Sequence, residues 1–156
     1  MNRLVRKLAM MLMIGSLLHS TPAATQVSPT TKKAARGQIT QGPEIALAKD
    51  WFTVIRWTTN NPGGSPVHYG IVHYGTGPKD LSQTAKNPIR LNPYHSSTVF
   101  RVHLYNLKPQ TPYYYKVTSI ASNGKSDGME SSVNQFTTPG TGQRVVNYPP
   151  QPARPR

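Results

Sequence analysis

Residues 107–117 read LKPQTPYYYKV, and no other segment of the chain indicates the fold as clearly. Leu107 is an apolar side chain just before a turn. Pro109 fixes the backbone angle of that turn and gives up an amide donor that the turn does not need. Tyr113 then stands where its hydroxyl can return to the backbone of the turn, an arrangement known as a tyrosine corner. The stretch predicts the corner of a β-sandwich, with Leu107, Pro109 and Tyr113 as structural residues.

The residues after this corner alternate as they do in a strand with one buried face. Successive side chains of a strand point to opposite sides of the sheet, so Tyr115 and Val117 share the core side with Tyr113. Tyr114 and Lys116 then point outward. The same alternation on other apolar runs predicts further core residues, namely Ile55, Trp57, Phe100, Val102 and Leu104.

The middle of the chain reads as a series of strands. Short β-branched and aromatic runs alternate with turns rich in Gly, Pro and Asn, and no stretch between residues 42 and 139 has a helical period. This spacing predicts an all-β sandwich of about seven strands. Six runs are distinct: residues 44–48, 52–59, 65–77, 97–104, 112–120 and 131–138.

Residues 1–24 have the order of a secretory signal peptide. Three cations precede an apolar run at residues 8–18, and small residues follow, with cleavage expected after Ala23 or Ala24. The run is shorter than the roughly 20 residues that cross a bilayer. The alternative is a buried N-terminal helix. We expect an exported protein, secreted or periplasmic, with no transmembrane segment after cleavage.

The flanks of the predicted domain are polar and basic. Residues 25–41 read as a basic linker, and residues 140–156, rich in Pro and Arg, read as a disordered tail. The formal net charge is +13, with much of the excess on these flanks. The chain has no cysteine, which excludes disulfides and thiol catalysis. A basic protein that is exported encounters anionic polymers first. Nucleic acid would bind it only through unspecific, salt-sensitive contacts.

Several positions together match a known pattern: Trp57 ends the second run, Tyr74-Gly75 ends the third, residues 107–117 hold Leu-x-Pro-x-Thr-x-Tyr-x-Tyr-x-Val, and Phe136-Thr137-Thr138-Pro139 follows. The series resembles a fibronectin type III domain, and its Leu-x-Pro segment is most similar to the N-terminal domain of purple acid phosphatases. The resemblance implies a seven-stranded immunoglobulin-like sandwich over residues 42–139, flanked by disordered arms. It also implies that Val72, Tyr74 and Phe136 lie in the core.

The resemblance carries a fold without an activity. The resemblance implies that catalysis in purple acid phosphatases belongs to a second domain, which carries Gly-Asp, Gly-Asn-His and His-x-His metal motifs. This sequence has no Gly-Asp, no Asn-His and no His-x-His. We therefore expect no catalytic residue, no metal and no cofactor. A truncated or partner-dependent metallophosphatase is the alternative.

The tetrapeptide Val-His-Tyr-Gly occurs twice, at residues 67–70 and 72–75. Its histidines, His68 and His73, are five residues apart and so face opposite sides of a strand. They cannot share a metal unless a bulge intervenes. The family pattern turns His73 outward and leaves His68 at the entrance of the strand, and we expect structural roles for both.

One exposed patch is a candidate for binding. Arg101, His103 and Tyr105 alternate outward on one strand, and together with Tyr114 they predict a basic and aromatic patch able to stack on sugars or bases. Ordinary cross-strand pairing is the alternative. The sequence predicts a non-catalytic accessory module that contacts a protein partner or an anionic envelope or extracellular polymer. A carbohydrate-binding module that uses this patch is a second hypothesis.

Overall fold

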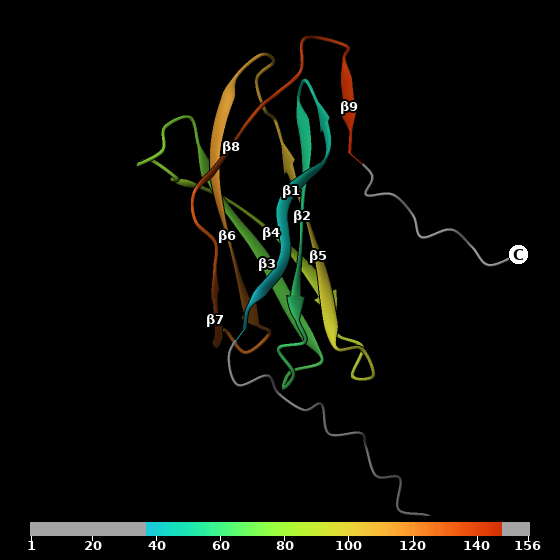
Figure 1. Cartoon of the computed structure of the whole chain (residues 1–156). Helices are drawn as coiled ribbons and strands as arrows, with labels where there is room; N and C mark the ends of the chain where they lie inside the picture. The colour runs from blue at the N-terminus through green and yellow to red at the C-terminus, as the bar shows by residue number, and fades with distance from the viewer. Residues whose placement is uncertain (1–36, 148–156) are drawn as a thin grey trace, which may run out of the picture.

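The computed structural model describes residues 37–147, which form two antiparallel sheets packed face to face (Figure 1). The expected all-β sandwich is confirmed, but these residues form nine strands rather than seven. No helix able to span a membrane occurs between residues 37 and 147. The strands are β1 (Ile39–Lys49), β2 (Phe52–Asn60), β3 (Val67–Gly75), β4 (Gln83–Arg90), β5 (Ser97–Tyr105), β6 (Pro112–Ala121), β7 (Ser126–Glu130), β8 (Asn134–Thr137) and β9 (Arg144–Val146).

The strands divide into a four-stranded and a five-stranded sheet. The first has the order β5-β2-β1-β9, and the second has the order β4-β3-β6-β7, with β8 also paired to β6. β2 and β5 pair along their whole length from Phe52↔Tyr105 to Asn60↔Ser97. This unbroken register fixes which side chains of β2 and β5 share the outer face of the four-stranded sheet.

Beyond the six runs found in the sequence, the structure contains three strands with weak sequence signals, β4, β7 and β9. β4 lies at a sheet edge and contains Pro88, which an edge strand tolerates because one side needs no donors. The predicted last strand, residues 131–138, is shorter in the structure, where it is β8, and a separate strand β7 precedes it. β9 is the third addition, and it lies in the predicted tail.

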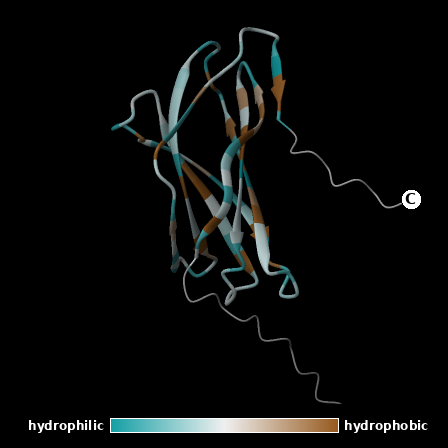
Figure 2. Ribbon diagram, viewed as in Figure 1, coloured by the Kyte–Doolittle hydropathy of each residue, from teal (hydrophilic) through white to brown (hydrophobic). Residues whose placement is uncertain are grey.

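The folded part therefore extends beyond residues 42–139 at both ends. Residues 39–41 of the predicted linker belong to β1, and residues 144–146 of the predicted tail form β9. β9 pairs with β1 from Leu47↔Val146 to Lys49↔Arg144, which gives the backbone of β1 a second partner. Figure 2 shows β9 passing from hydrophilic to hydrophobic along its length. The predicted signal peptide and residues 148–156 lie outside the described residues.

The core lies between the two sheets, and hydrophobic and hydrophilic residues alternate along the strands (Figure 2). Trp57 stacks on Phe100 with ring centroids 5.2 Å apart. Pro109 is the exception to the predicted core, because it is exposed at the turn between β5 and β6. The other predicted core residues are buried: Ile55, Trp57, Val72, Tyr74, Phe100, Val102, Leu104, Leu107, Tyr113, Tyr115, Val117 and Phe136.

The tyrosine corner is present. The Tyr113 hydroxyl accepts a hydrogen bond from the Lys108 amide at 3.1 Å, and the Tyr113 ring stacks on Phe136. Pro109 lies one residue after this amide, outside the core, and acts on the turn through its backbone angle alone. The corner thus ties the loop between β5 and β6 to the first residues of β6.

Candidate functional site

The predicted patch is split between the two sheets. Arg101, His103 and Tyr105 point outward from β5, on the outer face of the four-stranded sheet. Tyr114 belongs to β6, which pairs with β3 and β8 in the five-stranded sheet, and its side chain lies on the opposite face of the sandwich. The prediction that Tyr114 joins the other three is corrected, because the outer faces of stacked sheets look away from each other.

Two aromatic residues that the sequence analysis did not include take the place of Tyr114. Phe52, the first residue of β2, lies directly opposite Tyr105, with ring centroids 5.0 Å apart. Its ring is also 5.7 Å from the His103 ring and 5.6 Å from the Trp51 ring. We call Trp51, Phe52, His103 and Tyr105 the aromatic cluster.

Two rings of the aromatic cluster are open to solvent. The exposed fraction is 49% for Trp51 and 52% for Tyr105, whereas Phe52 is half-buried between them. The Trp51 carbonyl accepts a hydrogen bond from the Leu107 amide at 3.0 Å, which ties the β1–β2 turn to the end of β5. The exposed rings are therefore presented on a fixed backbone.

Cations lie on both sides of the aromatic cluster. Lys49 pairs across strands with Arg144, and the Lys49 Nζ atom is 5.8 Å from the centre of the Trp51 ring. On the other side, Arg101 pairs across strands with Arg56. Directly opposite residues of an antiparallel pair share a face, so both cation pairs lie on the outer face. We call the aromatic cluster with Lys49, Arg56, Arg101 and Arg144 the aromatic–basic surface.

The carboxylates near this surface already have partners. Glu44 accepts from the Arg56 guanidinium at 2.5 Å. Asp50 accepts from the Gly142 amide at 3.1 Å through its Oδ2 atom. Lys49, Arg101 and Arg144 have no carboxylate among the salt bridges of the described residues. The surface is therefore aromatic at its centre and positive at its margins.

A signal for Phe52 was present in the sequence. Because Ile55 and Trp57 point inward, Phe52 and Val54 must point outward, and two apolar outward residues in one strand are unusual for a solvated face. No comparable signal identifies Trp51, which precedes the strand. It joins the cluster through its contact with Phe52.

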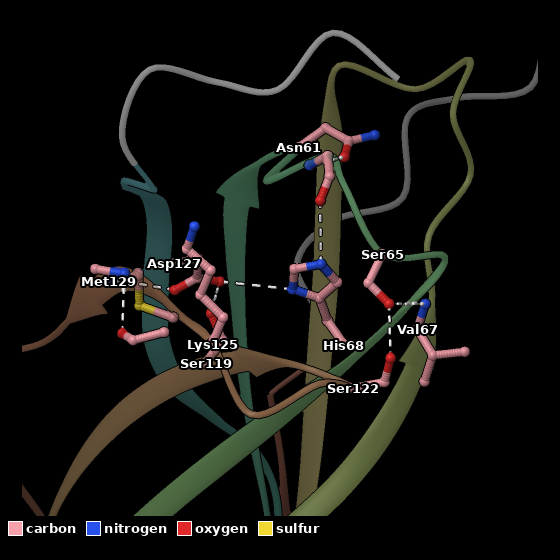
Figure 3. A network of polar contacts seen from close by, with 12 residues as sticks. Asn61, Ser65, Val67, His68, Ser119, Ser122, Lys125, Asp127 and Met129 are labelled. Carbon is pink, nitrogen blue, oxygen red and sulfur yellow. Dashed lines mark hydrogen bonds and ion pairs between the residues drawn. The ribbon is translucent and has the colours of Figure 1, made fainter. Parts of the chain in front are cut away.

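The second polar feature is at the other end of the sandwich, around His68 (Figure 3). His68 is only 2% exposed, and its Nε2 atom lies 3.2 Å from the Gly63 carbonyl, to which it donates. Its Nδ1 atom faces the Asp127 carboxylate, 3.8 Å from Oδ2. Asp127 accepts from the Ser119 hydroxyl and from the Met129 amide. His68 thereby links the loop before β3 to β7.

His73 lies on the outer face, where its ring contacts the Thr118 and Thr84 hydroxyls. The two histidines are thus on opposite faces, and no bulge interrupts β3 between them. A pocket of about 190 Å³ borders His68, Asp127 and the exposed Lys125. Between residues 37 and 147, no three His, Cys, Asp or Glu side chains gather to hold a metal ion.

Two buried tyrosines have perturbed acidities for structural reasons. Burial, and then the Glu44 carboxylate, raise the pKa of Tyr115 to about 12. Burial, and then Tyr113, raise the pKa of Tyr74. A raised pKa keeps the phenol neutral, and both rings belong to the core cluster. These shifts mark packing rather than a catalytic acid or base.

The fold defines a class of protein: an all-β sandwich of the fibronectin type III type, with an exposed aromatic and basic sheet face. The family model described as "Purple acid Phosphatase, N-terminal domain" matches residues 45–138, and the chain belongs to this family. What matches is the non-catalytic domain of that name, in agreement with the resemblance at residues 107–117. No curated protein matches the chain.

Solved structures with a similar fold include several fibronectin type III domains. The FN1–FN3 domains of chicken CNTN1 align with 17% identity and a TM-score of 0.44, over 65% of this chain and 32% of that one. The FN5 domain of Drosophila Lar aligns with 18% identity and a TM-score of 0.40, over 67% and 98%. The sensor domain of the anti-sigma factor RsgI4 of Pseudobacteroides cellulosolvens aligns with 18% identity and a TM-score of 0.44, over 74% and 92%.

Proposed function

We propose that this chain is an exported, non-catalytic accessory module that binds a partner at the cell envelope or outside the cell. The observation that carries the proposal is the aromatic–basic surface. Solvent-exposed aromatic rings on a fixed backbone, with cations beside them, are typical of binding surfaces. Its membership of a non-catalytic domain family supports the accessory role.

The signal-peptide pattern of residues 1–24 supports export. Mass spectrometry of the chain recovered from cells and medium tests it, and we expect a mature N-terminus at residue 24 or 25. Recovery of the uncleaved chain from the cytoplasm would contradict export.

Retention on the cell envelope tests binding. Tagged mature chain is incubated with envelope and secreted fractions and eluted with a salt gradient. We expect the wild type to be retained and the variant Trp51→Ala/Tyr105→Ala to be released at lower salt. Tyr94→Ala is the matched control, because Tyr94 is 79% exposed in the loop between β4 and β5. Equal retention of all three proteins would contradict the proposal.

A partner-dependent metallophosphatase is the alternative function. It requires hydrolysis of a phosphate ester in the presence of added divalent metal. We expect no hydrolysis. The His68 site offers one imidazole and one carboxylate, and the Asp127 carboxylate already accepts hydrogen bonds from Ser119 and Met129. Turnover that His68→Gln abolishes would replace the accessory function with an enzymatic one.

A further inference from the structure

We infer that the ligand of the aromatic–basic surface is a linear acidic polysaccharide. The inference rests on the proposed function, because it names the class of partner for the same surface. Three features of that surface carry it: the cation pairs at its margins, the open rings between them, and the satisfied carboxylates nearby.

The cation pairs are the first feature. Arg101 lies directly opposite Arg56, and Lys49 lies directly opposite Arg144. Like charges opposite one another on a sheet destabilise it, and only Arg56 has a carboxylate partner. A ligand that carries an anionic group at each margin would remove this repulsion on both sides at once. The arrangement thus fits a ligand with repeated negative charges.

The rings are the second feature. Trp51 and Tyr105 each contact Phe52, at 5.6 and 5.0 Å between centroids, so the two exposed rings lie at most about 11 Å apart. A disaccharide is long enough to reach from one ring to the other. The apolar C–H face of a pyranose packs on an open aromatic face, while its carboxylates or sulfates remain free for the flanking cations. Aromatic side chains supply this contact area without a charge of their own.

The charge balance of the surface favours a polyanion over a protein partner. The centre of a protein–protein interface is depleted of charged residues, and an unpaired charge buried there is costly. Here Lys49, Arg101 and Arg144 surround a small aromatic centre, and the nearby acids Glu44 and Asp50 are already bonded. A flexible polyanion can neutralise these cations without burying them.

Binding of polygalacturonate tests the inference. This polymer carries one carboxylate on each sugar, and neutral dextran of similar length is its control ligand. Affinity is measured by calorimetry with the mature chain, and we expect binding to polygalacturonate that weakens with salt and no binding to dextran. Trp51→Ala/Tyr105→Ala should weaken binding by about tenfold or more, since this variant loses stacking but keeps every cation.

Charge variants complete the test. Arg101→Gln and Arg144→Gln should each weaken binding and reduce its salt dependence, because each removes an anion contact. Lys125→Gln is the matched control, because Lys125 is exposed in the loop between β6 and β7, at the other end of the sandwich (Figure 1). Thermal unfolding of each variant shows that it is folded.

Three results would overturn the inference. Unchanged affinity of the ring variant would show that charge alone, on the sheet face or on the basic flanks, holds the polymer. Tighter, ring-dependent binding of single-stranded poly(dT) would replace the polysaccharide with a nucleic acid. A third result would be that the chain does not bind polygalacturonate but retains one envelope protein at high salt, in a way that depends on the rings. The ligand would then be a protein rather than a polysaccharide, and the accessory function would stand.

Discussion

Glycine ends both copies of Val-His-Tyr-Gly, and the structure gives a separate steric reason for each. A Cβ atom at Gly70 would lie 2.9 Å from Cδ1 of Phe100 and 2.9 Å from Cη2 of Trp57. At Gly75 it would lie 1.9 Å from the Asp80 carbonyl oxygen. The repeat therefore reflects two close approaches to β3, one by the aromatic stack of the core and one by the following loop.

Gly70→Ala should destabilise the domain through the first of these contacts. The methyl group would push on Trp57 and Phe100, which are each 1% exposed, and overpacking of a core typically costs about 1–3 kcal/mol. Chemical denaturation measures the change. Gly77→Ala is the control, since the nearest atom to its Cβ is 3.9 Å away. Equal stability of both variants would contradict the packing described for β3.

Tyr113→Phe tests the corner. Loss of the hydroxyl leaves the partly buried Lys108 amide without its acceptor, which should lower the free energy of unfolding by about 1–3 kcal/mol. Tyr114→Phe is the matched neighbour, because its side chain points away from the core and should lose little. A cost near zero for Tyr113→Phe would mean that the hydrogen bond contributes nothing to the stability of the corner.

The raised pKa of Tyr115 makes the stability of the domain depend on pH in the alkaline range. Its folded pKa, about 12, lies above the usual value of 10.0. A raised pKa means that the protonated form is favoured in the fold. The contribution of the neutral Tyr115 phenol to the free energy of unfolding is full below pH 10 and is lost as the pH rises toward 12. Wild type should lose more stability than Tyr115→Phe between pH 10 and 12, as measured by urea unfolding at each pH. Parallel losses would contradict the shift.

At the scale of the element, the outer strands of the four-stranded sheet place like charges together. Arg144→Gln removes the repulsion between β9 and β1, because Arg144 lies opposite Lys49. We expect it to raise the free energy of unfolding by about 0.2–1 kcal/mol, the usual range for a cross-strand pair. The same variant should bind polygalacturonate more weakly. A loss of stability in thermal unfolding would show that the pair is not repulsive.

Strands with strong alternation were predictable from the sequence, and edge strands were not. β2, β5 and β6 each carry two or more apolar residues at successive inward positions, so their inward faces follow from the pattern alone. In β4 only Ala85 and Ile89 pack against the core, and Pro88 lies between Asn87 and Ile89. Met129 is the single buried side chain of β7. Such elements are fixed by their neighbours rather than by their own sequence.

For the candidate site, too, the sequence predicts what lies within one strand but not what depends on the pairing of strands. Arg101, His103 and Tyr105 share one strand, so alternation was enough to place them on one face. The contact of Tyr105 with Phe52 depends on the register between β5 and β2, which alternation does not specify. Tyr114 was misplaced because membership of a sheet is a property of the whole topology.

At the scale of the whole molecule, the sandwich separates two polar regions. The aromatic–basic surface extends from the β1–β2 turn to the middle of β2 and β5, and the His68 network joins loops at the opposite end (Figures 1 and 3). Trp51 belongs to the first region and is 49% exposed, whereas Trp57 is 1% exposed in the core. The chain has no third tryptophan. One indole therefore reports on the proposed binding surface and the other on the interior.

The most direct measurement follows the two indole N–H signals in a ¹H–¹⁵N correlation spectrum while the envelope fraction is added to the mature chain. We predict that the Trp51 signal shifts or broadens as the chain binds, while the Trp57 signal stays in place. Trp51→Phe identifies the two signals. Retention of the chain with both indole signals unchanged would contradict this prediction, because binding would then bypass the aromatic–basic surface.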